Sequence, residues 1–256
     1  MMSAVGHWSR AVAGALVAAV VASAVVVSPL RAQIPVAEYA ARRAALAARI
    51  DSGVVLAFGR REPVNHWPPF YQNPHFRYLT GFLESNAAFV MVKRGGAVTS
   101  TLFLEKPNAR TALYLGDRKT PQEVAASLGL GARFTDELTK VADSLATTGL
   151  PFYAISDAQS AEFDTRDSLS FGRNFVVDFM KRHPTLKVVD ASKQVEQLRA
   201  KKSEAELAII TKAAEISAKA HEEVMRTIRP GMKESEIQAI MEATYRKLGA
   251  DGPGYT

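Results

Sequence analysis

Apolar residues recur along this chain at spacings that change from one segment to the next. Between Glu38 and Ile50 they fall every three or four positions among arginines, which is typical of an amphipathic helix that ends before Gly53. Short runs of β-branched and aromatic residues follow, separated by glycine, proline, asparagine and charged turns. These runs predict strands of one sheet at residues 54–58, 87–92, 98–104 and 112–115.

The following part of the chain alternates between helical and strand-like patterns. Helices are expected at residues 121–128 and 136–145, and a partly irregular one at 160–182. Strands are expected at 152–155 and 187–189. The alternation predicts a mixed α/β domain, with a joint to a second domain at residues 190–194.

Two long helices are predicted after this joint. Ser203 and Glu206 have the spacing of a capping box, in which each side chain satisfies a free amide at the start of a helix. Pro230 and Gly231 interrupt the helical period, which resumes at 234–248. The first helix carries a stripe that we expect to face a core, formed by Leu207, Ile210, Ala214, Ser217, His221, Val224 and Ile228.

Length and composition indicate a globular protein of more than one domain. The chain has 256 residues, of which 47% are apolar and 23% charged. We expect a complete domain at residues 33–190 and the beginning of a second at 191–256. Lysine and arginine number 32 against 26 acidic residues, and so small and scattered an excess does not indicate nucleic-acid binding.

Residues 1–32 have the layout of a signal peptide. Arg10 precedes an uncharged, mostly Ala and Val segment at 11–27, which is followed by the helix-breaking Pro29 and the small Ala32. We therefore expect export to the periplasm or the cell exterior, with cleavage after Ala32; the alternative is a retained membrane anchor. The chain has no cysteine, so disulfides, thiol catalysis and Cys metal sites are excluded.

Familiar catalytic motifs do not account for the chain. His221 and Glu222 could begin a zinc-protease helix, but Met225 stands where the second histidine is required, so a hydrogen-bonded core histidine is the favoured interpretation. The glycines at 129 and 131 follow a predicted helix, and Phe134 occupies the third glycine position of a dinucleotide loop. The sequence contains no phosphate loop and no nucleophile elbow.

Residues 65–81 are dense in aromatic side chains and turn formers, which taken alone predicts a loop that buries aromatics against the sheet. Within this segment, eight residues leading into the apolar run at 87–92 resemble the signature of the aminopeptidase P N-terminal domain: Tyr71, Gln72, Asn73, Phe76, Tyr78, Leu79, Thr80 and Gly81. A second set resembles the entry into the pita-bread metallopeptidase domain: Arg199, Lys202, Ser203, Glu206, Leu207, Ile210, Ala213 or Ala214, Ile228, Arg229, Pro230, Gly231, Met232, Glu234, Gly249, Ala250, Pro253 and Tyr255.

The resemblance implies an α/β fold: a creatinase/aminopeptidase P N-terminal-like mixed sheet with flanking helices, then the first two helices of a truncated pita-bread domain. It also implies an Xaa-Pro aminopeptidase, which removes the residue preceding proline at the N-terminus of proline-containing peptides. In that family two divalent metal ions, usually manganese, are held by two Asp, one His and two Glu, and the metals activate a bridging hydroxide. All five ligands lie beyond the position that matches Thr256. No catalytic residue or metal ligand is therefore assigned within the chain, Asp251 included, and we expect this chain alone to bind no metal and to be inactive.

The resemblance gives roles to a few individual residues. Tyr255 matches a tyrosine whose hydroxyl orients a metal-binding carboxylate, and a strand-core tyrosine is the alternative. Tyr114 matches a tryptophan that reaches a neighbouring subunit's active site, and an ordinary sheet aromatic is the alternative. Asn65 stands near the position where relatives carry an acidic residue in a contact between subunits, so the sequence departs from the family pattern there. Family members are commonly dimers or tetramers, so a homo-oligomer is expected.

Three other functions stay open from the sequence. An Xaa-Pro dipeptidase shares the pita-bread entry, and creatinase uses the same scaffold without metal. A noncatalytic binding or assembly module that keeps the N-terminal domain is the third. The chain stops inside a predicted strand, which favours an incomplete sequence of a longer enzyme, because a half-built strand leaves backbone groups unpaired.

Overall fold

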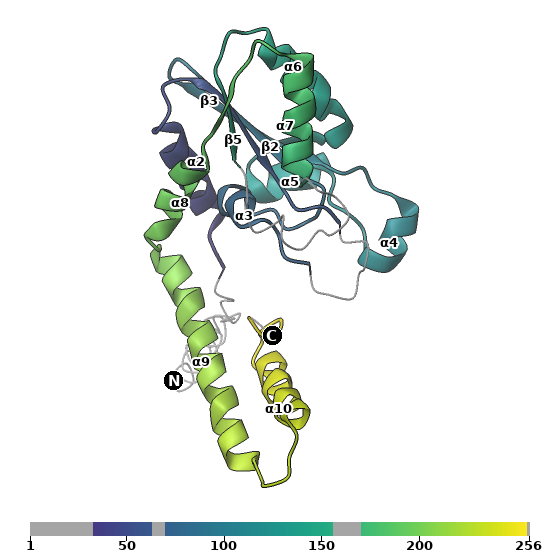
Figure 1. Cartoon of the computed structure of the whole chain (residues 1–256), viewed down its shortest axis with the longest axis vertical. Coiled ribbons are helices and arrows are strands. Elements are labelled where there is room, and N and C mark those ends of the chain that lie inside the picture. The colour runs from purple at the N-terminus through teal and green to yellow at the C-terminus, as the bar shows by residue number, and fades with distance from the viewer. Residues whose placement is uncertain (1–32, 63–69, 156–169, 255–256) are drawn as a thin grey trace, which may run out of the picture. The chain divides into compact units, whose positions relative to one another are not determined.

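A mixed sheet organises the part of the chain that the computed structural model describes, which is residues 33–62, 70–155 and 170–254 (Figure 1). Within these ranges the strand order is β4-β3-β2-β1-β5-β6. β2 is antiparallel to β1 and β3, whereas β4 is parallel to β3, β5 to β1, and β6 to β5. The strands are β1 Gly53–Phe58, β2 Ala88–Arg94, β3 Ala97–Leu104, β4 Gly131–Phe134, β5 Phe152–Ile155 and β6 Val188–Asp190.

Strand β1 occupies the middle of the sheet and is buried on both faces. Every residue of its sequence Gly-Val-Val-Leu-Ala-Phe is buried, which is expected of a strand covered on both sides. Leu56 pairs with Val90 of β2 on one side and with Ala154 of β5 on the other. Alternate side chains of β1 therefore enter two separate cores, one on each face of the sheet.

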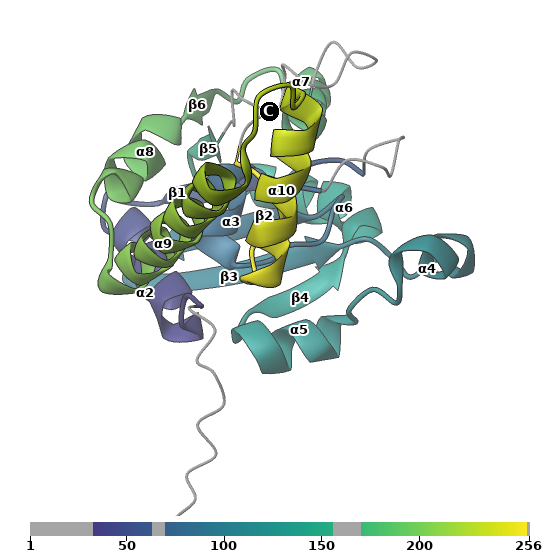
Figure 2. The ribbon, with the colours of Figure 1, turned by 90° about the horizontal axis from the view of Figure 1, so that it is seen from below.

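Helices cover both faces of the sheet (Figures 1 and 2). The first core contains apolar residues of α2 Val36–Ala47, α3 Pro74–Thr80, α5 Pro121–Leu128 and α8 Ser192–Ala200. The second core contains residues of α6 Leu138–Ala146, which follows a short 3-10 turn at Thr135–Glu137, and of α7 Phe171–Arg182. Three further helices are α4 Ala109–Leu115, α9 Glu204–Thr227 and α10 Glu234–Lys247, and the last two pack against each other.

The predicted strands at 54–58, 87–92, 98–104, 152–155 and 187–189 are confirmed to within a residue or two. The strand predicted at 112–115 is wrong, because these residues end helix α4. The Asn108 side chain accepts a hydrogen bond from the Arg110 amide and starts this helix, and Gly116, with φ of 79°, ends it. A local cap thus overrides the weak strand preference of four residues.

Three more segments differ from the expectation. Residues 131–134 form strand β4, the second half of the aromatic-rich segment forms helix α3, and α8 begins at Ser192 inside the expected joint. Pro74 at the first helical position and Gly81 in the left-handed conformation are the start and stop signals of α3. The helix expected at 160–182 begins at Phe171 in the described residues, and 160–169 lie outside them.

Helix α9 has the predicted capping box, but its predicted apolar stripe does not face a core. Leu207 and Ile210 are each 50% exposed, and Ile216 and Ala220 are the buried residues instead. His221 is also exposed, so the core-histidine interpretation is wrong, although its Nδ1 lies 2.8 Å from the Ser217 carbonyl oxygen as the hydrogen-bonded form requires. The period alone does not identify which of two apolar faces finds a partner.

No helix in the described ranges is long and apolar enough to cross a membrane. The segment at 1–32, to which the signal-peptide prediction applies, lies outside them.

Candidate functional site

The structure describes one of the two residues to which a functional role was predicted. Tyr114 lies on helix α4, so the alternative of an ordinary sheet aromatic is wrong. Tyr255 lies outside the described residues, and so does Asn65. The roles predicted for Tyr114 and Tyr255 remain predictions.

Helix α4 presents an apolar surface, which we call the α4 surface and define as Leu113 and Tyr114. The two side chains are 79% and 72% exposed. Figures 1 and 2 both show α4 lying away from the sheet at the end of an extended connection. The α4 surface is thus a small exposed apolar area on a projecting helix (Figure 1).

A polar cluster around a buried arginine fastens the segment that follows α4, and we call it the Arg118 cluster. The Arg118 side chain is only 9% exposed. Its Nη2 lies 3.1 Å from Glu62 Oε2, 2.9 Å from Glu105 Oε2 and 3.1 Å from Ser85 Oγ. The Ser85 hydroxyl also donates to Glu62. One guanidinium thus joins the end of α4 to segments before β2 and after β3, and these charge-assisted bonds are the strong kind.

Asn86 holds the two acids of the Arg118 cluster in place. Its Nδ2 donates to Glu105 Oε2 over 2.9 Å, and its Oδ1 accepts from the Glu62 amide over 2.9 Å. Asn86 adopts φ of 56°, a left-handed conformation that asparagine tolerates better than most residues. The cluster is therefore built by local backbone geometry as well as by charge.

A second acid, Glu84, contacts the same loop and has a shifted pKa. Burial raises the pKa of the Glu84 carboxyl above its usual 4.5, and a hydrogen bond from the Lys119 amide and the charges of Arg118 and Lys119 partly offset the increase. The folded protein therefore holds this proton more tightly than the unfolded chain. The contribution of Glu84 to stability is more favourable in acid and is lost as pH rises through the folded pKa.

A Glu84→Gln variant is accordingly expected to gain stability relative to the parent as pH rises from about 4.5 to 7, because the amide carries no charge to desolvate. Its Oε1 can still accept from the Lys119 amide, so the hydrogen bond is kept. Urea unfolding of both proteins at the two pH values measures the difference. If the variant instead becomes less stable relative to the parent as pH rises, the raised pKa of Glu84 would be contradicted.

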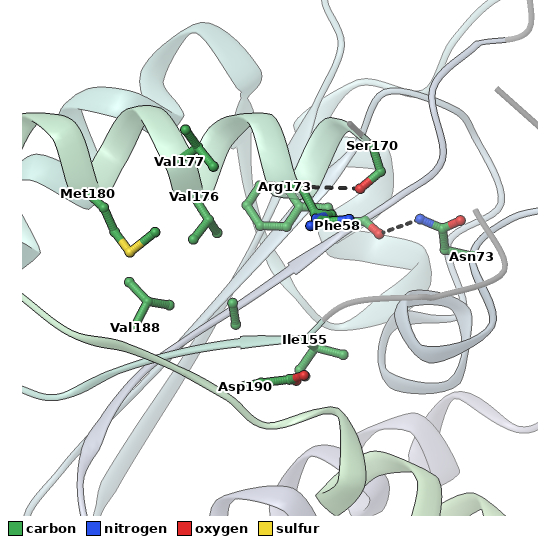
Figure 3. Close-up of a pocket in the computed structure, with 12 residues that line it drawn as sticks. Phe58, Asn73, Ile155, Ser170, Arg173, Val176, Val177, Met180, Val188 and Asp190 are labelled. Atoms are coloured by element: carbon green, nitrogen blue, oxygen red, sulfur yellow. Dashed lines mark hydrogen bonds between the residues drawn. The ribbon is translucent and has the colours of Figure 1, made fainter. Parts of the chain in front are cut away.

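A pocket of about 280 Å³ lies between helix α7 and the carboxyl ends of β1, β5 and β6 (Figure 3). Its walls are mainly apolar and include Phe58, Ile155 and Val176. Two of the polar side chains around it bind the backbone: Asn73 Nδ2 donates to the Phe58 carbonyl over 3.0 Å, and Ser170 Oγ caps α7. The described residues that line this pocket include no nucleophile paired with a base.

The described residues do not provide a ligand set for the metal pair that the resemblance implies. Within residues 33–62, 70–155 and 170–254, no three His, Asp or Glu side chains gather so that they could hold a metal ion.

Comparison with protein families divides the chain into two parts. The model described as "Aminopeptidase P, N-terminal domain" matches residues 39–150, and that of "Metallopeptidase family M24" matches residues 208–256. Similar curated proteins include the Xaa-Pro aminopeptidase of Escherichia coli (strain K12), which is 25% identical over 225 residues. That alignment covers 85% of this chain and 51% of the relative.

Other relatives show the same partial coverage. The Xaa-Pro aminopeptidase of Haemophilus influenzae is 24% identical, with 88% of this chain and 50% of the relative covered. An Xaa-Pro dipeptidase of Pongo abelii is also 24% identical, with 88% and 46% covered. The chain thus spans about half the length of the curated relatives it matches.

Solved structures have the same fold. Aminopeptidase P from E. coli in a low-pH form has a TM-score of 0.74 and 25% identity, and the match covers 88% of this chain and 52% of the other. Proline aminopeptidase P II from Yersinia pestis has a TM-score of 0.73, with 87% and 52% covered. These likenesses confirm the predicted mixed sheet with flanking helices. Two family models in the expected order and a matching fold lead to one conclusion: the chain contains an N-terminal domain of the aminopeptidase P type, followed by the start of a family M24 metallopeptidase domain.

Proposed function

We propose that these residues are part of a metal-dependent Xaa-Pro aminopeptidase, which removes the N-terminal residue that precedes proline in a peptide. The observation that carries the proposal is the match of both domain types in one chain, together with its similarity to relatives named for this activity. A related E. coli structure is described as zinc-substituted aminopeptidase P in complex with product, which supports a divalent metal. We propose two such ions, manganese in the natural enzyme.

We place the metal pair and the substrate site outside these 256 residues. Two observations support this placement: the chain spans about half the length of its relatives, and the described residues hold no group of metal ligands. The N-terminal domain then serves to position the catalytic domain and to contact other subunits. The 256-residue chain alone is inactive under this proposal.

The activity is tested with a peptide that carries proline at its second position. The 256-residue chain with added Mn²⁺ is expected to release no N-terminal residue, whereas a protein extended to a complete M24 domain releases it, and a chelator abolishes the release. Mass spectrometry of the products provides the measurement. Chelator-sensitive release by the 256-residue chain would contradict our placement of the site, and an inert extended protein would contradict the function.

An Xaa-Pro dipeptidase is the second candidate, because a protein of that name is among the relatives. The extended protein separates the two functions when it is given an Xaa-Pro dipeptide and a longer Xaa-Pro peptide at equal concentration. Preference for the longer peptide indicates the aminopeptidase.

For the α4 surface we propose contact with a second copy of this chain. A Tyr114→Ala variant is expected to change the free energy of unfolding by less than about 0.5 kcal/mol, because the side chain is largely exposed. The same variant is expected to weaken self-association of the extended protein, as sedimentation measures. A stability loss above about 1 kcal/mol would show that Tyr114 packs within its own chain, and unchanged sedimentation would count against the contact.

We also propose that residues 1–32 direct export and are removed. The supporting observation is the uncharged segment at 11–27 after Arg10. The intact mass of the protein recovered from the host distinguishes a chain that starts at Gln33 from one that keeps the segment.

A further inference from the structure

Arg42 on helix α2 is held in one orientation by its own domain. Its side chain is 8% exposed and forms an ion pair with Glu38 one turn earlier. Its Nη1 donates to the Tyr78 carbonyl oxygen over 3.3 Å, and its guanidinium lies 4.2 Å from the centre of the Tyr78 ring and 5.2 Å from that of Tyr39. Helices α2 and α3 thus fix a buried cation whose planar group has a defined direction.

The partner of this cation on helix α9 is Glu206. One oxygen of Glu206 completes the capping box, because Oε2 accepts from the Ser203 amide over 2.9 Å while Ser203 Oγ accepts from the Glu206 amide over 3.1 Å. The other oxygen, Oε1, lies 3.0 Å from Arg42 Nη2. A capping box uses only one carboxylate oxygen, so the second is available to connect the start of α9 to α2.

Helix α8, which precedes α9, is already fixed to the N-terminal domain. Val195 is fully buried in the first core, and Arg49 Nη1 donates to the Gln194 carbonyl oxygen over 2.9 Å. Lys202 Nζ donates to the Arg199 carbonyl oxygen over 2.6 Å and so closes the C-terminal end of α8. The link from α8 to α9 is short, because α8 ends at Ala200 and α9 begins at Glu204. Glu206 lies in the first turn of α9.

Apolar packing does not fill this joint. A cavity of about 320 Å³ lies beside Arg42, and its lining includes Tyr39, Ile209 and Ile210. Ile210 is half-exposed. A loosely packed apolar contact has little directional preference, whereas a charge-assisted contact between a fixed guanidinium and a carboxylate has a strong one.

We propose that Arg42 is a positioning residue that sets the direction of α9, the first helix of the M24 part, through Glu206. The contact couples the cap that starts α9 to its docking on the N-terminal domain. It also gives a physical role to Lys202, Ser203 and Glu206, which the sequence motif contains. The proposal goes beyond the peptidase activity and does not depend on it.

The test measures the distance between the two parts in the 256-residue chain. The chain has no cysteine, so exposed Thr99 in β3 and Lys219 in α9 can each be replaced by cysteine and spin-labelled without side reactions. The parent is expected to give one narrow distance peak, and an Arg42→Met variant is expected to lose it. The matched control is Arg43→Met, since buried Arg43 donates to the Leu79 carbonyl oxygen of α3.

A second pair of variants separates the ion pair from the cap. Glu206→Gln keeps an oxygen for the Ser203 amide and removes the charge that faces Arg42, and Glu204→Gln removes a neighbouring exposed charge from the same turn. Hydrogen exchange of residues 207–216 is expected to accelerate about tenfold in Arg42→Met, less in Glu206→Gln, and not in either control. The double variant is expected to resemble Arg42→Met alone.

Three outcomes would overturn the proposal: a narrow peak that survives in Arg42→Met, a broad distribution already in the parent, or Glu206→Gln behaving like Glu204→Gln. Circular dichroism of each variant reports whether the chain is folded. If Arg42→Met does not fold, the comparison of Glu206→Gln with Glu204→Gln decides the question, since neither removes a buried side chain.

Discussion

A Phe76→Ala variant is expected to lower the free energy of unfolding by about 3–5 kcal/mol. Phe76 lies on helix α3 and is fully buried in the first core, among residues of α2, the sheet and α8. Removing its ring loses the favourable free energy of transferring the aromatic group from water into the core. It also leaves a cavity that the close-packed neighbours fill only in part. Urea unfolding followed by circular dichroism measures the loss.

The matched control lies in the same aromatic-rich segment. Tyr71 is 51% exposed, so Tyr71→Ala is expected to change stability by less than about 1 kcal/mol. Equal effects of the two substitutions would mean that the residues before α3 are as buried as the helix itself. A Phe76→Ala loss below about 1 kcal/mol would contradict the assigned burial.

An Arg118→Met variant has the second largest expected effect, a loss of about 2 kcal/mol. It leaves Glu62 and Glu105 without the cation that lies between them. A fully buried pair would cost more, but both acids are partly exposed and water can solvate them after the change. Because the cluster fastens the segment after α4, amide hydrogens of residues 109–115 are also expected to exchange faster.

Lys119→Met serves as the control for Arg118→Met. The Lys119 side chain is exposed, and the contact of this residue with Glu84 uses its backbone amide, which methionine retains. Exchange in α4 that is the same in the two variants would show that Arg118 does not hold the helix. A loss of stability without faster exchange would mean that Arg118 fastens only the segments that carry Glu62 and Glu105.

Much of the sheet is predictable because its strands carry a strong local signal. The run at 54–58 is apolar without alternation, as a strand covered on both faces must be, and the structure confirms it. The capping box of Ser203 and Glu206 is equally readable, since both partners lie within one turn. Features formed by residues that lie close together in the sequence, such as buried strands and helix caps, can thus be predicted from a single sequence.

The rest depends on contacts between residues far apart in the chain. Arg42 and Arg118 look like ordinary surface arginines in the sequence, because their acid partners on α9 and after β3 come from distant segments. The sequence places Tyr114 in a strand because four residues favour that state, and a single asparagine cap four positions before this run decides otherwise. In the stripe of α9 the predicted period is correct, and the predicted buried face is not.

The central position of β1 has a consequence for how the chain is made. β1 needs β2, which follows soon after it, and β5, whose first residue is Phe152, before both of its edges are paired. The chain is synthesised from the N-terminus, so β1 is made early. One edge of this strand, which is apolar on both faces, therefore stays unpaired until β5 has been synthesised. Such an intermediate invites pairing with another nascent chain, so we expect the yield of folded protein to depend on translation speed and chaperones between β2 and β5.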